Sequence, residues 1–217
     1  MNHAPAFRDR HHAGQALAAV LGERSWQHPV VLALPRGGVP IGHEIARALS
    51  APLDILLVRK IGAPGHEEYA LGAVVDSDEP QWVVDEDMLR LFNPSPDWFA
   101  GQMAEQLREI ERRRALYHGS RPTVPLERRD LIVVDDGLAS GSSAYVALKA
   151  LRHRKPRSIV LAVPVGPLET VEKLRPEVDE LFCLEMLEPF RAVGLHYEDF
   201  QVTDLEVMEL LAAGADP

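Results

Sequence analysis

The sequence predicts an α/β fold in which a mostly parallel sheet carries helices on both faces. Short, continuous apolar runs such as "VVLAL" and "LIVV" recur along the chain, as is typical of strands buried on both faces. They alternate with longer segments whose apolar residues have helical spacing, and this alternation favours crossover helices on a parallel sheet. The length of 217 residues suits one such domain.

In the first half of the chain, a segment with helical spacing comes first, and expected strands and helices then alternate. We expect helices at Gly14–Leu21 and Gly38–Leu49, and buried strands at Val30–Leu34 and Leu53–Val58. A more irregular region follows, with strands at Tyr69–Val75 and Trp82–Val84 and a long helix at Asp97–Tyr117. We interpret the arginines of that helix as a solvated face; they are Arg108, Arg112, Arg113 and Arg114.

In the second half of the chain, expected strands and helices alternate more regularly. We expect strands at Asp130–Asp136, Ser158–Val165 and Glu180–Leu184, and helices at Ser143–Arg152 and Leu168–Leu174. Ligands bind such sheets at the carboxyl ends of the strands. The loops that follow Leu34, Val58 and Val134 are therefore the places where we expect a site.

Composition narrows the functional classes. The net charge of −10 argues against general affinity for nucleic acid or for an anionic membrane, so we expect neither as a partner. The single cysteine, Cys183, fits a reducing compartment, and we expect a cytoplasmic protein. The start of the chain has no apolar signal core, and no apolar run approaches the roughly 20 residues of a transmembrane helix.

The stretch "LIVVDDGLASGSSA" (residues 131–144) carries the strongest chemical signal. Asp135 and Asp136 end a strand, and adjacent carboxylates need a hydrogen-bonding or cationic partner, such as vicinal ribose hydroxyls or a divalent cation. The glycines and serines of 137–143 allow backbone amides to converge before a helix N-terminus, which suits a phosphate monoester. The alternative is an Asx turn followed by a helix cap.

This stretch resembles the 5-phosphoribosyl-1-pyrophosphate (PRPP) signature of type I phosphoribosyltransferases. The resemblance implies that Asp135 and Asp136 bind the ribose and, indirectly, a metal. It assigns the 5′-phosphate to the loop made of Gly137, Leu138, Ala139, Ser140, Gly141, Ser142 and Ser143.

Two further loops agree with this resemblance. In "LPRGGVPIG", Arg36, Gly37 and Gly38 combine a cation with bare backbone before a helix, which suits pyrophosphate, although a structural turn is the alternative. Family members often hold a cis peptide in this loop, and the equivalent bond is Pro35–Arg36. Arg59 and Lys60 of "VRK" resemble catalytic cations that face pyrophosphate in adenine- and orotate-type members.

The segment that follows these cations is expected to be a mobile lid. Ile61–Tyr69 is rich in glycine, proline and charge, and such a loop can close over a site and exclude water. His66, Glu67 and Glu68 would move with it, or would simply be solvated.

Family members also carry a small hood that selects the base. It is built from terminal segments, here about 1–25 and 185–217, around a core of about 28–185 with an irregular or helical insertion at about 80–125. Phe190 or Tyr197 would stack on a flat heterocycle, or would fix the tail to the core. Ala139 stands where 6-oxopurine enzymes carry an aspartate base, so we expect poor use of those bases.

The resemblance implies a single-domain enzyme that transfers ribose 5-phosphate between PRPP and a nitrogenous acceptor, with Mg²⁺ as cofactor and release of pyrophosphate. We expect a homodimer. A non-catalytic PRPP- or nucleotide-binding regulator is the alternative, and a hydrolase acting on the same sugar phosphate is a third class.

Overall fold

The computed structural model describes residues 5–76, 81–119 and 123–214 and confirms the α/β fold. Its main sheet has five strands in the order β2-β1-β6-β7-β8, and every neighbouring pair is parallel. The strands are β1 (Val30–Ala33), β2 (Leu53–Ile55), β6 (Asp130–Val134), β7 (Ser158–Pro167) and β8 (Glu180–Leu187). β1 and β6 are adjacent, so the loops that follow them meet at the carboxyl edge of the sheet.

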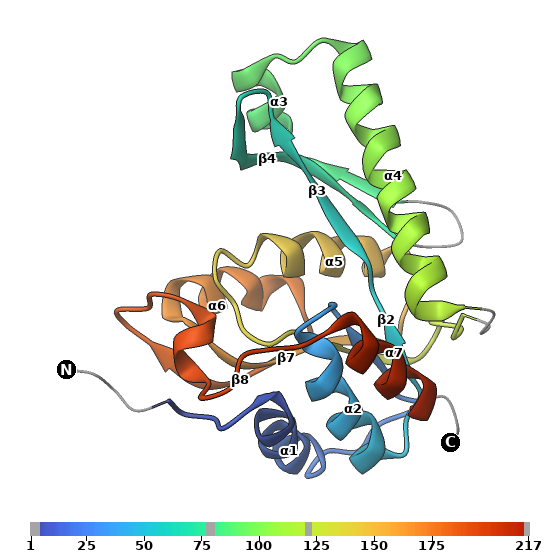
Figure 1. The fold of residues 1–217 in the computed structure, drawn as a ribbon, viewed down its shortest axis with the longest axis vertical. Coiled ribbons are helices and arrows are strands. Elements are labelled where there is room, and N and C mark those ends of the chain that lie inside the picture. Colours follow the sequence, from blue (N-terminus) through green and yellow to red (C-terminus); the bar gives the residue numbers. More distant parts are fainter. Residues whose placement is uncertain (1–4, 77–80, 120–122, 215–217) are drawn as a thin grey trace.

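Helices cover both faces of this sheet (Figure 1). Successive strand residues point to opposite faces, so Val31 and Ala33 pack on one side and Val30 and Leu32 on the other. The first side is covered by α1 (Arg10–Leu21) and α2 (Gly38–Leu49), and the second by α5 (Ser142–Arg152) and α6 (Leu168–Leu174). This two-sided burial is why the strands read as continuous apolar runs.

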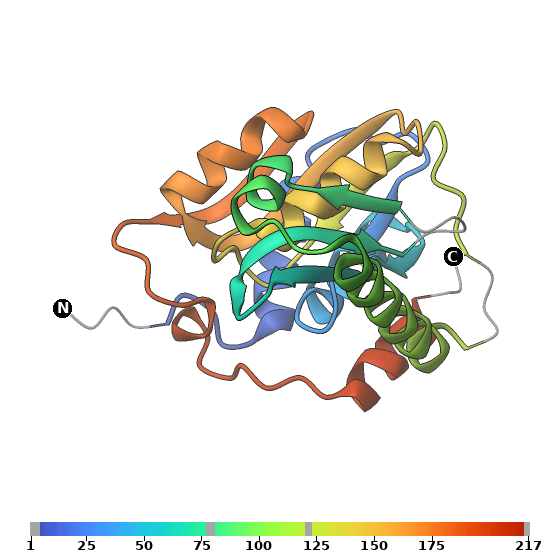
Figure 2. The same ribbon diagram turned by 90° about the horizontal axis from the view of Figure 1, so that it is seen from above.

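A second, antiparallel sheet rises from the body where the chain leaves β2, the edge strand of the main sheet (Figures 1 and 2). It consists of β3 (Val58–Ala63), β4 (His66–Val75) and β5 (Gln81–Val84). The helices α3 (Glu86–Phe92) and α4 (Pro96–His118) complete this arm. The expected strand at 53–58 is therefore two strands, because β2 pairs with β1 and the chain then leaves to pair with β4.

The expected loop at 61–69 is a β-hairpin instead. Ile61 and Ala63 are buried and alternate with more exposed neighbours, which anchors β3 as a strand. Gly65 takes a φ of 73° at the turn, a conformation that glycine adopts without strain. His66 is exposed near Phe92, and nothing is described of the side chains of residues 67 and 68. Mobility of the hairpin stays a prediction.

The terminal segments do more than form a hood. α1 places Ala13, Leu17 and Leu21 in the core at helical spacing, so it also covers one face of the sheet. The tail after β8 crosses the carboxyl edge, with a 3₁₀ turn at Val193–His196, and ends in α7 (Asp204–Ala213), which was not expected. Another 3₁₀ turn, Arg175–Glu177, follows α6. None of the described helices is both long and apolar enough to cross a membrane.

Candidate substrate-binding site

The loops after β1 and β6 press directly against each other. The amide of Leu34 donates to the carbonyl of Val134 at 2.8 Å, which extends the strand pairing to the loop entrance. A Cβ added to Gly37 would lie 1.9 Å from Oδ2 of Asp136, and one on Gly38 would lie 2.6 Å from the Val134 carbonyl oxygen. Both glycines are therefore required for the close approach of the loop to the acidic pair.

Asp136 is held by a buried cation. Arg10, 5% exposed, donates from both Nε (3.0 Å) and Nη2 to Oδ2 of Asp136. Its Nη1 donates to the carbonyl of Phe200 at 2.8 Å, and its guanidinium lies 3.9 Å from the centre of the Phe200 ring. The hydroxyl of Tyr197 donates to the Asp136 backbone carbonyl at 2.6 Å. Asp136 thus ties α1 and the C-terminal tail to the site.

Asp135 is in a different environment. Its Oδ1 accepts from the amide of Asp136 at 2.9 Å, and the residue lines a small cavity together with Arg59 and Ser143. Burial, followed by the charge of Asp136, raises the pKa of Asp135 well above its usual range, although the Asp136 amide and Arg10 oppose the rise. Of the two acidic residues, Asp135 is the one that lines this cavity.

The loop of residues 137–143 has the form of an anion cup. Gly141 takes a φ of 69° at the start of α5, and Ala139 and Ser140 are exposed. Within the described part of the chain, the amides of Ala139, Ser140, Gly141 and Ser143 donate no hydrogen bond. The loop is anchored elsewhere, because the Leu138 amide donates to the Val165 carbonyl and Thr170 donates to the Ala139 carbonyl. The hydroxyls of Ser140 and Ser142 lie 2.8 Å apart.

The three predicted cationic residues lie near the carboxyl edge of the main sheet, but their side chains have different surroundings. Arg59 lines the cavity, and its Nε donates to Oε1 of Gln106 on α4 at 3.0 Å. Lys60 follows it in the strand, so its side chain leaves the opposite face, and desolvation lowers its pKa. Arg36 is half exposed, 3.9 Å from Asp204, and follows a cis Pro35–Arg36 bond.

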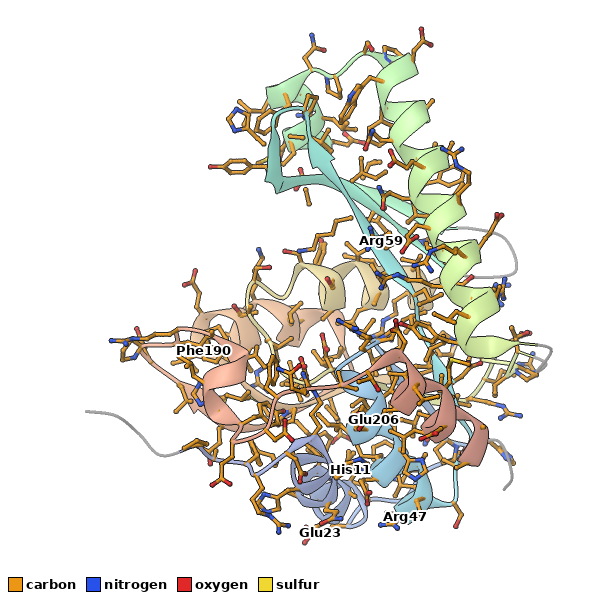
Figure 3. All side chains as sticks on the ribbon, in the orientation of Figure 1. His11, Glu23, Arg47, Arg59, Phe190 and Glu206 are labelled. Carbon is orange, nitrogen blue, oxygen red and sulfur yellow. The ribbon has the colours of Figure 1, made fainter. Side chains whose placement is uncertain are left out.

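The two candidate stacking residues have partners of their own. Tyr197 is 4% exposed and packs against Phe7 and Phe200, so it fixes the tail to the core and is not available to an acceptor. Phe190 is partly exposed and stacks on His196 at 5.3 Å. Figure 3 shows Phe190 on the side of the body away from Arg59.

Sequence reasoning missed two residues of this site. Arg10 had no signal except its place among the charged residues before the first apolar helix. Arg113 was assigned to a solvated face, yet it lines the cavity beside Arg59 and Asp135. Its signal is helical spacing, since it shares a face of α4 with the buried residues Ile110 and Tyr117.

The donor set limits how a divalent cation would bind. Among the described residues, no three His, Cys, Asp or Glu side chains are grouped to hold a metal ion. Oδ2 of Asp136 already accepts from Arg10, and Asp135 is the acidic residue that lines the cavity. These residues fit an Mg²⁺ ion that takes most of its ligands from substrate oxygens and water.

Known proteins match this sequence over nearly the whole chain. The phosphoribosyl transferase domain model matches residues 10–199. A Mycobacterium tuberculosis protein, provisionally named a phosphoribosyl transferase, is 39% identical over 206 residues, which is 94% of this chain. That match covers 46% of the relative, so the chain spans about half the length of the curated relatives it matches.

Solved structures of other proteins share this fold. The crystal structure of TT1426 from Thermus thermophilus has a TM-score of 0.85 and 41% identity, over 96% of this chain and 99% of that one. A Neisseria gonorrhoeae protein crystallised with bound ppGpp shares the fold, with a TM-score of 0.54 and 17% identity over 99% and 98% of the two chains. The chain belongs to the phosphoribosyl transferase domain family.

Proposed function

We propose that this chain transfers ribose 5-phosphate from PRPP to a nitrogen of a small acceptor, most readily a nucleobase, and releases pyrophosphate. The observation that carries the proposal is the meeting of three features at one sheet edge. They are the cavity residue Asp135, the amides of Ala139, Ser140, Gly141 and Ser143, and the loop of Arg36, Gly37 and Gly38. Each matches one part of PRPP, respectively its ribose, its 5′-phosphate and its pyrophosphate.

In this mechanism the protein binds, orients and excludes water. The amides of 139–143 hold the 5′-phosphate, and Asp135 accepts a hydrogen bond from a ribose hydroxyl, which fixes the sugar ring. As the bond from the anomeric carbon to pyrophosphate breaks, positive charge develops on the sugar and negative charge on the leaving group. Arg36 and Arg59 stabilise the negative charge because they are already positioned before the reaction. Mg²⁺, when bound, supplies further neutralisation of the pyrophosphate.

The test is pyrophosphate release with PRPP, MgCl₂ and a panel of nucleobases and amines. The matched control is Asp135→Asn, which keeps the size of the side chain and removes its charge. Acceptor-dependent release by the wild type, lost in Asp135→Asn, supports transfer. Tight PRPP binding without release with any acceptor supports the regulator instead, and release without an acceptor supports a hydrolase.

Three further expectations accompany this proposal. A homodimer is checked by analytical ultracentrifugation, and a cytoplasmic location by fractionation of the source cells. The dependence on Mg²⁺ is checked by adding EDTA to the same assay, which should abolish release and be reversed by excess MgCl₂.

A further inference from the structure

One face of α4 points toward the substrate cavity. Gln106, Ile110, Arg113 and Tyr117 recur at spacings of three or four residues and so lie on the same side of the helix. Ile110 and Tyr117 are 3% and 5% exposed, which fixes that side against the body. Arg113 lies between them, and its side chain is 30% exposed, compared with 63% for its neighbour Arg112.

Arg113 contributes to a cavity of about 100 Å³ at the carboxyl edge. Arg59 of β3, Asp135 after β6 and Ser143 of α5 line the same cavity. α4 also holds Arg59 in place, since Oε1 of Gln106 accepts from its Nε at 3.0 Å. The helix α4 therefore supplies one cavity cation, Arg113, and orients another, Arg59.

The cavity carries more positive than negative charge. Two arginines, Arg59 and Arg113, and one carboxylate residue, Asp135, line it, and Arg59 bonds a neutral amide. The Nε of Arg113 donates to Oε1 of Glu109 at 2.7 Å, and Glu109 does not line the cavity. In the described part of the chain, the Nη groups of Arg113 make no hydrogen bond. Such an excess of cationic donors suits a multiply charged anion.

A third arginine, Arg36, is linked to α4 through Asp204 and Tyr117. The hydroxyl of Tyr117 donates to Oδ1 of Asp204 at 2.6 Å, and Nη1 of Arg36 lies 3.9 Å from the same oxygen. Burial and the bond to Asp204 raise the pKa of Tyr117 to about 12, while Arg113 and Arg36 both oppose the rise. Asp204 thus lies between Arg36 and Tyr117 of α4.

We propose that Arg113 binds the pyrophosphate group of PRPP, together with Arg36 and Arg59. The inference rests on the proposed function and extends its site to the helix α4, which supplies none of the residues named there. The planar guanidinium presents two Nη groups to neighbouring phosphate oxygens, and Glu109 orients it from the other side.

The chain offers a matched control for this assignment. Arg112 also donates to Glu109, from Nε at 2.8 Å, but it does not line the cavity. Calorimetry would compare the wild type, Arg113→Ala, Arg113→Lys and Arg112→Ala with three ligands in the presence of Mg²⁺. The ligands are PRPP, inorganic pyrophosphate and ribose 5-phosphate, of which the last has no pyrophosphate group. Thermal denaturation of each variant checks folding.

We expect Arg113→Ala to weaken PRPP and pyrophosphate roughly 10- to 100-fold, the range for loss of hydrogen bonds to a charged group. Arg113→Lys should recover part of this loss. Arg112→Ala should stay within about twofold of the wild type, since exposed ion pairs contribute little. Affinity for ribose 5-phosphate should be the same in all four proteins.

Equal pyrophosphate affinity in Arg113→Ala and the wild type would overturn the inference and leave the proposed transfer intact. An equal loss in Arg112→Ala would also overturn it, because Glu109 or the helix itself would then be responsible. A wild type that binds neither PRPP nor pyrophosphate would overturn both proposals. Binding that depends on Arg113 without any pyrophosphate release would support the inference and overturn the transfer.

Discussion

The two adjacent aspartates should respond in opposite ways to loss of charge. Asp136→Asn removes the negative partner of Arg10, whose side chain is 6% exposed, while the Asp136 side chain is 17% exposed. Two hydrogen bonds from the guanidinium then reach a neutral amide, or lose their acceptor. We expect unfolding free energy to fall by about 2–3 kcal/mol, below the range of about 3–5 kcal/mol for breaking a fully buried pair. In a chain of this length, Tm should fall by roughly 4–12 °C.

Asp135→Asn should leave stability unchanged or increase it at neutral pH. A carboxyl group with a raised pKa in the folded state holds its proton where the unfolded chain has released it. The folded state therefore loses stability as pH rises from the unfolded pKa of about 3.9 through the folded pKa. The substitution removes this loss. The unfolding free energy of Asp135→Asn should therefore exceed that of the wild type at pH 8, and the difference should vanish near pH 4.

Urea denaturation of both variants at several pH values is the measurement. Arg10→Met combined with Asp136→Asn is the control, because removing both charges should recover part of the stability lost in the single variant. Calorimetry with PRPP should show lost affinity in Asp135→Asn and in the double variant Asp135→Asn/Asp136→Asn. Asp136 is thus assigned to stability, through Arg10, and Asp135 to binding. This assignment would be refuted if Asp136→Asn were as stable as the wild type, or if Asp135→Asn were less stable than Asp136→Asn.

Three other outcomes are expected. Gly37→Ala should fold but bind PRPP at least 10-fold more weakly, because its Cβ would displace the Asp136 carboxylate, and calorimetry with a folding control measures this. Hydrogen exchange at 61–69 should slow when PRPP and Mg²⁺ bind, and unchanged exchange would remove the lid from the mechanism. With Ala139 in place of an acidic base, hypoxanthine, guanine and xanthine should have kcat/KM values roughly 10²–10⁴-fold below that of the preferred acceptor. A 6-oxopurine as the best substrate would contradict the last expectation.

The local sequence determined the main sheet and its phosphate loop. Strands such as Val30–Ala33 are buried on both faces, so their apolar runs are continuous and visible in one dimension. The helix at Gly38–Leu49 has the predicted limits because helical spacing starts directly after the glycine pair and ends at Ser50. The loop of 137–143 could be predicted as well, since its chemistry lies in consecutive residues.

The tertiary structure decided the features that depend on distant partners. Arg10 meets Asp136 across 126 positions, and no local pattern encodes such a pair. Ile61–Tyr69 has the composition of a loop, but it forms strands because β4 and the buried Ile61 supply the pairing and the packing. Arg113 resembles a solvated arginine until Ile110 and Tyr117 are seen to fix its face against the body. Burial and long-range contact set these outcomes, and both arise only when the chain has folded.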